Sequence, residues 1–220
     1  KTTTNSFAGK IFDADINYSK KLFVCACEDG TARIFKIDEK LSYLTKIVIS
    51  QVRLTSIFWE YKKSNSIISG DGNGILTVWD FETKRNISRL TTNVSDHKND
   101  INSICVIENT IITGNSVGHT SFWDILTGTL LSSFKEHSGA VLAVAALTEN
   151  GQNLVYSTGE DSKIALFFKT REELWVKRNV FSPLKHEIYS LAVNKQKGNL
   201  FCGGIEGILA ITFPQNNLKN

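Results

Sequence analysis

Short runs in which apolar and polar residues alternate cover most of the chain. In one representative stretch they occur at 54–60, 66–71, 75–81 and 87–92, and turn-forming residues separate them. A period of two over a short run is typical of a β-strand. No segment shows a sustained helical period with capping residues, so we predict an all-β fold with almost no helix.

The strand pattern repeats at a constant interval. A turn followed by an alternating run recurs five times, with equivalent positions at Gly30, Gly74, Gly118, Lys163 and Gly207. These positions are 44, 44, 45 and 44 residues apart. In two units the run ends in Trp-Asp, at Trp79-Asp80 and Trp123-Asp124. Four short strands per unit, with Trp-Asp at the end of the third, indicate the four-stranded blade of a WD-repeat β-propeller.

The five predicted blades lie at about 10–50, 54–92, 101–136, 141–181 and 188–214. Stacking such sheets face to face buries both of their surfaces, and we expect aromatic residues to fill the space between them: Phe35, Trp79, Trp123 and Phe168. The fifth unit stops after three strands. The chain also contains no methionine and begins at Lys1. We therefore expect an excerpt of a longer protein, an arc of a seven-bladed ring that does not fold well alone.

Each WD blade is expected to hold its turns with a network of His, Ser or Thr, Trp and Asp. His97 and His137 each precede a first strand by four residues, and we interpret them as structural. The turn aspartate, six residues before the aromatic residue, is retained at Asp29. Its counterparts elsewhere are Asn73, Val117 and Ser162, of which only Asn73 is a fair substitute.

Neither catalysis nor a cofactor finds support in the sequence. The four histidines are scattered, and no Cys or His group has zinc-ligand spacing. The glycine-rich stretch at 70–74 lies between two strands and lacks the following helix that a phosphate loop needs. The longest apolar run, 140–147, is far too short to span a membrane. The four cysteines fit reduced, buried thiols of a cytosolic or nuclear protein. We predict a non-enzymatic protein without cofactor, metal or small-molecule substrate.

Charge is placed unevenly although the net charge is only +3. Loops between first and second strands carry lysine pairs that share one rim of a propeller: Lys20, Lys21, Lys62, Lys63, Lys195 and Lys197. Tyr18 and Tyr61 lie beside them and could stack on bases. Glu60, Glu108 and Glu149 flank or occupy loops of the same kind. Two interpretations stay open: ordinary solvated lysines, or contacts with RNA or an acidic partner.

Several stretches resemble the cirhin family of WD-repeat proteins. They are 27–37, 110–118, 122–130 and the outer strand that begins at Leu174, and the resemblance extends over essentially the whole chain in the same blade order. Members carry two tandem propellers and belong to the UtpA subcomplex of the small-subunit processome, which assembles on nascent pre-ribosomal RNA in the nucleolus. The resemblance implies the third to seventh blades of the first propeller, and it supplies no catalytic residues.

These observations together predict a scaffold in ribosome biogenesis. It would act in pre-18S processing, bind other UtpA propellers and contact the 5′ external transcribed spacer. The alternative is a peptide-binding adaptor, such as a ubiquitin-ligase substrate receptor or a chromatin reader. That function would need a focused cluster in the loops of the opposite face, which carry Arg53, His97, His137, Lys185 and His186.

Overall fold

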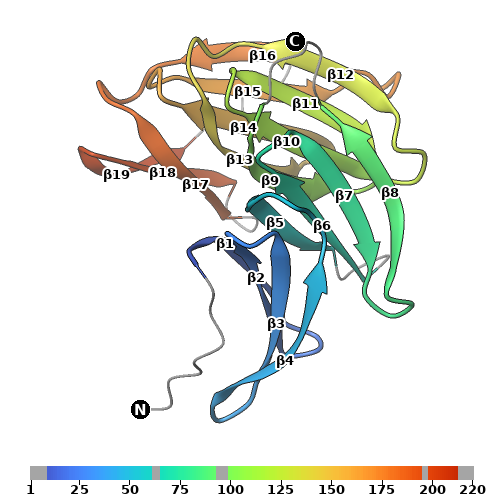
Figure 1. Cartoon of the computed structure of the whole chain (residues 1–220). Helices are drawn as coiled ribbons and strands as arrows, with labels where there is room; N and C mark the ends of the chain where they lie inside the picture. The colour runs from blue at the N-terminus through green and yellow to red at the C-terminus, as the bar shows by residue number, and fades with distance from the viewer. Residues whose placement is uncertain (1–8, 61–64, 93–98, 195–197, 213–220) are drawn as a thin grey trace. The chain divides into compact units, whose positions relative to one another are not determined.

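The protein folds into antiparallel β-sheets, as the alternating pattern predicts. The computed structural model describes residues 9–60, 65–92, 99–194 and 198–212. Within these ranges nineteen strands form five sheets, and no α-helix occurs (Figure 1). The prediction of an all-β, WD-type propeller built of blades is therefore confirmed. The chain divides into two compact units, Lys1–Ile104 and Cys105–Asn220.

The first unit contains two complete blades. The strands of the first blade are β1 (Ile11–Asn17), β2 (Leu22–Cys27), β3 (Thr31–Ile37) and β4 (Leu41–Val48). Those of the second are β5 (Leu54–Glu60), β6 (Ser66–Asp71), β7 (Ile75–Asp80) and β8 (Arg85–Thr91). In each blade the strands pair in sequence order, so each strand joins the next through a short connection (blue to cyan-green in Figure 1).

A third blade begins in the first unit and ends in the second. Its strands are β9 (Ile101–Ile107), β10 (Thr110–Asn115), β11 (His119–Asp124) and β12 (Leu130–Lys135). The fourth blade contains β13 (Val141–Glu149), β14 (Gln152–Gly159), β15 (Ile164–Lys169) and β16 (Trp175–Phe181). The fifth sheet contains β17 (Ile188–Asn194), β18 (Asn199–Gly204) and β19 (Gly207–Thr212). The predicted lack of a fourth strand there concerns residues 213–220, which lie outside the described residues.

Burial within a blade explains why the alternation is clear in some strands and weak in others. Every residue of β6 and of β10 is buried, because a strand in the middle of stacked sheets is covered on both faces. The outer strand β8 is mostly exposed and polar. Burial therefore falls from the second strand of a blade to the fourth.

Two aspartates connect the first blade to the second. A carboxylate oxygen of Asp13 accepts a hydrogen bond from the Ile57 backbone N–H at 2.8 Å, and one of Asp15 accepts from the Trp59 N–H at 2.7 Å. These N–H groups lie on the edge of β5 that no strand pairs. Beside this ladder, Trp59 packs in a core that includes Val24 and Ile34. Apolar packing and a side-chain ladder thus hold the two blades together.

The second unit is packed around aromatic rings. Phe122 stacks on Trp175 with centroids 4.6 Å apart, and its ring lies 5.5 Å from that of Phe167. Phe167 is fully buried and pairs in register with Val155, as Trp123 pairs with Ile111 in the preceding blade. The register that equates Phe168 with the tryptophan is therefore wrong by one residue. Its expected place between sheets is confirmed, because Phe168 packs half-buried against the core of the fourth and fifth blades.

The misassignment comes from the turn before β15. Gly118 has a φ of 91° and follows the last paired residue of β10, Gly114, by four positions. Ser162 has a φ of 57° and follows the last paired residue of β14, Thr158, by the same four positions. Ser162, not Lys163, is thus the counterpart of Gly118. A left-handed backbone favours glycine, so a serine there conceals the repeat from inspection of the sequence.

A β-bulge recurs near the start of the first strand. Register shifts occur between Ile11 and Asp13, between Leu54 and Ser56, between Val141 and Ala143, and between Ile188 and Ser190. The bulged residues are Phe12, Thr55, Leu142 and Tyr189. A bulge takes one residue out of the ladder and redirects its side chain.

Candidate functional site

The turn between β1 and β2 presents two of the predicted lysines. The buried Asn17 side chain organises this turn, because its Oδ1 accepts hydrogen bonds from Ser19 Oγ at 2.8 Å and from the Lys20 N–H at 3.1 Å. Lys21 has a φ of 51°, and its carbonyl accepts from the Ile37 N–H at 2.7 Å. Both lysine side chains are exposed on a backbone that these bonds fix.

Lys20 does not offer a free charge. Its Nζ forms an ion pair with Glu82 and lies 5.7 Å from the centroid of the Phe81 ring. Asn65 donates to the same carboxylate at 2.9 Å and accepts from Trp59 Nε1 at 3.1 Å. Lys20 therefore joins the first blade to the second as well as facing solvent, which the sequence did not predict.

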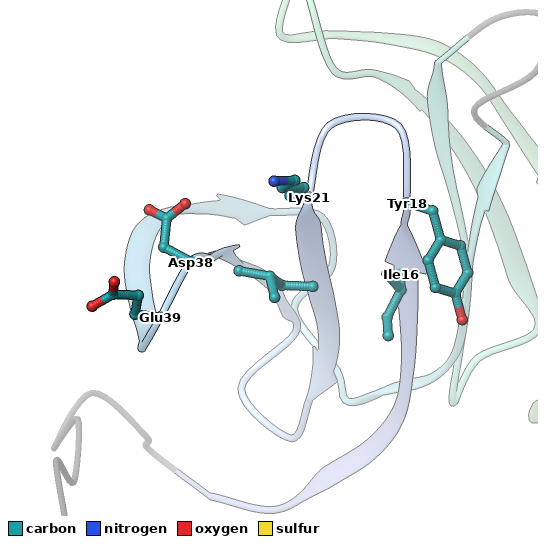
Figure 2. A pocket seen from close by; sticks show the side chains of 6 residues that line it. Ile16, Tyr18, Lys21, Asp38 and Glu39 are labelled. Carbon is teal, nitrogen blue, oxygen red and sulfur yellow. The ribbon is translucent and has the colours of Figure 1, made fainter.

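Lys21 lies at the edge of an open cavity on the first blade. The cavity has a volume of about 720 Å³ and is lined by Ile16, Tyr18, Lys21, Ile37, Asp38 and Glu39. Figure 2 shows Ile16 near the end of β1 and Tyr18 at the start of the turn that follows, with the two acidic side chains on the turn across from them. Tyr18 is 73% exposed, so its ring can stack on a ligand. Apolar residues form the floor, and charges of both signs lie at the edges.

Two further basic residues extend this surface. Lys84 ends the turn between β7 and β8, and Arg85 begins β8; this turn is on the same end of its blade as the first-to-second turn, and both residues are exposed. A Lys-Arg pair in a turn after Trp-Asp was the sequence signal for them. We call the set Lys20, Lys21, Lys84 and Arg85 the basic rim. Asp38, Glu39 and Glu82 lie in the same group of turns, so the rim carries mixed charge.

The remaining predicted lysines, Lys62, Lys63, Lys195 and Lys197, lie outside the described residues, as does Tyr61. The prediction that they share a sector with Lys20 and Lys21 stays a prediction. His97 also lies outside the described residues.

His137 forms the most complete polar network in the second unit. Its Nδ1 lies 2.8 Å from Asp161 Oδ1, and its Nε2 lies 2.8 Å from Ser157 Oγ. Burial opposes ionisation of Asp161, but the hydrogen bonds from His137 and the Ser138 N–H outweigh it and lower the pKa of that carboxyl. The turn aspartate of this blade is thus Asp161, and the interpretation of Ser162 as its poor substitute is wrong.

A Ser, a His and an Asp in this order are also the groups of a catalytic triad. Ser157 is completely buried and His137 is 2% exposed, so no substrate can reach the hydroxyl in this fold. In the preceding blade, Thr113 at the position of Ser157 accepts from Trp123 Nε1 at 3.1 Å. The network therefore ties a turn to its blade, as predicted for His137.

A serine takes the place of the histidine before the second blade. Ser50, four residues before β5, donates from Oγ to Asp71 Oδ2 at 2.7 Å. Asp29 instead accepts from Thr31 Oγ1 at 2.6 Å and from Arg33 Nη2 at 2.7 Å. All four cysteines are free and buried, as expected. The described residues include no group of three metal-ligating side chains, and no helix among them could cross a membrane.

Comparisons with known proteins agree with the fold. The family "WD domain, G-beta repeat" matches residues 128–167. The chain is 30% identical over 224 aligned residues to U3 small nucleolar RNA-associated protein 4 of Saccharomyces cerevisiae, and the match covers 93% of this chain and 28% of that protein. The protein of the same name from Schizosaccharomyces pombe is 26% identical, with 98% of this chain and 32% of the relative covered. The chain thus spans about a third or less of these relatives.

A solved structure supports the architecture alone. The crystal structure of the computationally designed Ika8 protein superimposes with a TM-score of 0.70 at 20% identity, covering 90% of this chain and 57% of that one. At this identity, the structural similarity shows the fold and says nothing about activity. The repeat, the sheets and these similarities lead to one statement: the chain consists of WD-type β-propeller blades.

Proposed function

We propose that this chain is part of a non-catalytic scaffold in ribosome biogenesis. It would act in the nucleolus, within the UtpA subcomplex of the small-subunit processome, on the 5′ external transcribed spacer of pre-ribosomal RNA and in pre-18S processing. The observation that carries the proposal is the similarity to U3 small nucleolar RNA-associated protein 4, which extends over 93% of the chain. A similarity restricted to one WD repeat would carry no such proposal.

The geometry favours a scaffold for a physical reason. Sheets whose middle strands are buried hold their turns on a rigid frame, and turns on a rigid frame bind partners without a large ordering cost. The Asn17 and Asn65 hydrogen bonds give the first two blades such turns. Many modest contacts over several turns would supply affinity, with other propellers of the subcomplex as protein partners.

The basic rim and Tyr18 are the proposed RNA contacts in the described residues. Lys21, Lys84 and Arg85 would neutralise phosphates, and the exposed Tyr18 ring would stack on a base. Lys62, Lys63, Lys195 and Lys197 would add to this surface. Lys20, paired with Glu82, would contribute less than its neighbour Lys21.

The experiment is affinity purification of the full-length protein, followed by mass spectrometry and sequencing of the bound RNA. We expect propeller proteins of the processome and 5′ external transcribed spacer RNA to be enriched. Enrichment of ubiquitin-ligase subunits or histones, without pre-ribosomal RNA, would contradict the proposal and favour the peptide-binding adaptor.

A charge-reversal pair tests the surface itself. The variant K21E/K84E should weaken crosslinking to pre-ribosomal RNA, and the difference from wild type should be largest at low salt, because salt screens the phosphate contacts that the variant loses. The matched control is K46E/R89E, which makes the same charge change at exposed positions on the outer strands β4 and β8. Equal crosslinking by both variants would refute the role of the rim and leave the scaffold proposal to the purification.

A further inference from the structure

The connection between β16 and β17 contains a modification motif that the proposed function does not use. Its sequence is Ser182-Pro183-Leu184-Lys185. A serine followed directly by proline, with a basic residue three positions after the serine, is the pattern that cyclin-dependent protein kinases select. Proline fits because it lacks an N–H that would otherwise remain unsatisfied in the kinase groove, and the basic residue meets acidic groups of the kinase.

The structure leaves the serine accessible. Ser182 is exposed, and strand pairing ends one residue earlier, at the pair of Ile164 with Phe181. No hydrogen bond to the Ser182 hydroxyl is formed within the described part of the chain. A nucleophile that is solvated and outside the sheet can be presented to a kinase without breaking the blade.

Few contacts hold the backbone of the connection in place. Its polar contact in the described structure is the Lys185 N–H, which lies 3.4 Å from Glu206 Oε2. The segment is attached at Leu184, which packs against the core of the fourth and fifth blades. Ser182 precedes that attachment by two residues, and Lys185 after it is exposed. A kinase needs an extended, detachable stretch of this length, whereas serines within strands cannot supply one.

We propose that Ser182 is a phosphorylation site for a cyclin-dependent protein kinase, with ATP as phosphoryl donor. Ser182 Oγ attacks the γ-phosphorus of ATP, and a new O–P bond forms. The bond from that phosphorus to the β–γ bridging oxygen breaks, and ADP leaves. The hydroxyl proton passes to the catalytic carboxylate of the kinase.

The surroundings indicate what the added charge does. A phosphoserine brings about 1.5 to 2 negative charges at neutral pH. In the unmodified protein, the Glu206 carboxylate lies near the Lys185 N–H and near His186, whose Nε2 lies 3.6 Å from Glu206 Oε1. The phosphate attracts the two basic residues and repels Glu206. Phosphorylation adds this charge three and four residues before Lys185 and His186, and it makes the β16–β17 connection more acidic.

The test is phosphorylation of the purified full-length protein by a recombinant cyclin-dependent kinase with ATP, with site occupancy measured by tandem mass spectrometry. Ser182 should become the main site within residues 99–194. P183A should lower the initial rate at Ser182 by at least about tenfold, and K185A should lower it several-fold. A tenfold loss corresponds to about 1.4 kcal/mol of transition-state binding. Circular dichroism of each variant checks that the blades remain folded.

Ser138 provides the matched control. It is an exposed serine in the connection between β12 and β13, the equivalent place one blade earlier, and glycine follows it instead of proline. S138A should leave total incorporation unchanged, and S182A should remove most of it from this region. Occupancy at Ser182 no higher than at Ser138, or an unchanged rate in P183A, would overturn the proposal.

Discussion

Nδ1 of His137 lies 2.8 Å from Oδ1 of Asp161, and this contact joins the end of the third blade to the turn before β15. Neither residue is near its partner in sequence, and both are largely withdrawn from solvent. The same imidazole reaches Ser157, so three polar groups satisfy one another inside the protein. The pair thus stabilises a turn that lacks the usual glycine.

Removal of this histidine should destabilise the second unit. H137A leaves Asp161 and Ser157 without their partner, and we expect a loss of about 2–3 kcal/mol in the free energy of unfolding. Chemical denaturation of the full-length protein measures it. The control H186A, at a side chain that is 62% exposed, should change stability by about 0.5 kcal/mol or less. Similar losses in both variants would contradict a structural role specific to His137.

Acid should weaken the same contact. The folded pKa of Asp161 is lower than its unfolded value of 3.8, so its contribution to stability is present above that value. It is lost as the pH falls through the folded pKa, where the carboxylate takes up a proton. Wild type should therefore lose more stability on acidification than D161N, which has no carboxylate to titrate. Parallel pH profiles of the two proteins would refute this linkage.

Asp13 and Asp15 should behave in the opposite way. Burial raises the pKa of both carboxyls, although hydrogen bonds from the Ile57 and Trp59 N–H groups act against it. A raised folded pKa gives a stability contribution that is present below 3.8 and lost as the pH rises through the folded pKa. D13N/D15N should thus melt at the same temperature as wild type or higher near neutral pH, and this advantage should shrink in acid.

The alanine variant separates charge from hydrogen bonding at the same positions. D13A/D15A leaves the two N–H groups of β5 without acceptors, which costs about 1 kcal/mol for each bond. Its melting temperature should fall below that of wild type at neutral pH. Equal melting temperatures for the asparagine and alanine variants would show that these carboxylates do not hold the second blade.

Two adjacent phenylalanines offer a test of the blade register. F167A removes a fully buried ring that contacts Phe122 and Phe134, and we expect a loss of about 3–5 kcal/mol. F168A removes a half-buried ring beneath Arg178 and should cost clearly less. Thermal unfolding of both variants decides between the two assignments. A larger loss in F168A would restore the register expected from the sequence.

Tyr18 should affect RNA binding through its ring. If the proposed surface binds pre-ribosomal RNA, Y18A should weaken binding by about 1–3 kcal/mol, the typical contribution of one stacked base. Y18F keeps the ring and should retain most of the affinity. Filter binding with a 5′ external transcribed spacer fragment measures both. Equal weakening by the two variants would implicate the hydroxyl group and exclude stacking.

Much of the fold could be predicted because blade formation is a local property. Alternation fixes the strands, and Trp79-Asp80 and Trp123-Asp124 fix the third strand of two blades. The fourth blade is the exception: the register predicted for it is one residue out, because Ser162 adopts the backbone conformation of a glycine. A side chain gives no sign of a left-handed φ, so the true aspartate, Asp161, appeared one place out of register.

The site was harder to predict than the fold. Lys20 and Glu82 are separated by 62 residues, and nothing in the sequence near either residue indicates their ion pair. Counting basic residues in equivalent loops therefore overestimated the charge that Lys20 presents. The acidic residues of the neighbouring turn, Asp38 and Glu39, were visible in the sequence, but their place at the cavity required the structure.

The recurring bulge at the first strands has a consequence for how such a protein can diversify. Phe12, Thr55, Leu142 and Tyr189 differ in size and polarity, yet the strands around them keep the same pairing. Thr55 is held by hydrogen bonds from its hydroxyl to the Gly70 and Ile101 carbonyls, but Phe12 and Tyr189 are exposed and can be exchanged at little cost to their blades. Natural selection, or a protein engineer, can therefore rewrite these two positions one at a time and give each blade a different recognition chemistry on an unchanged frame.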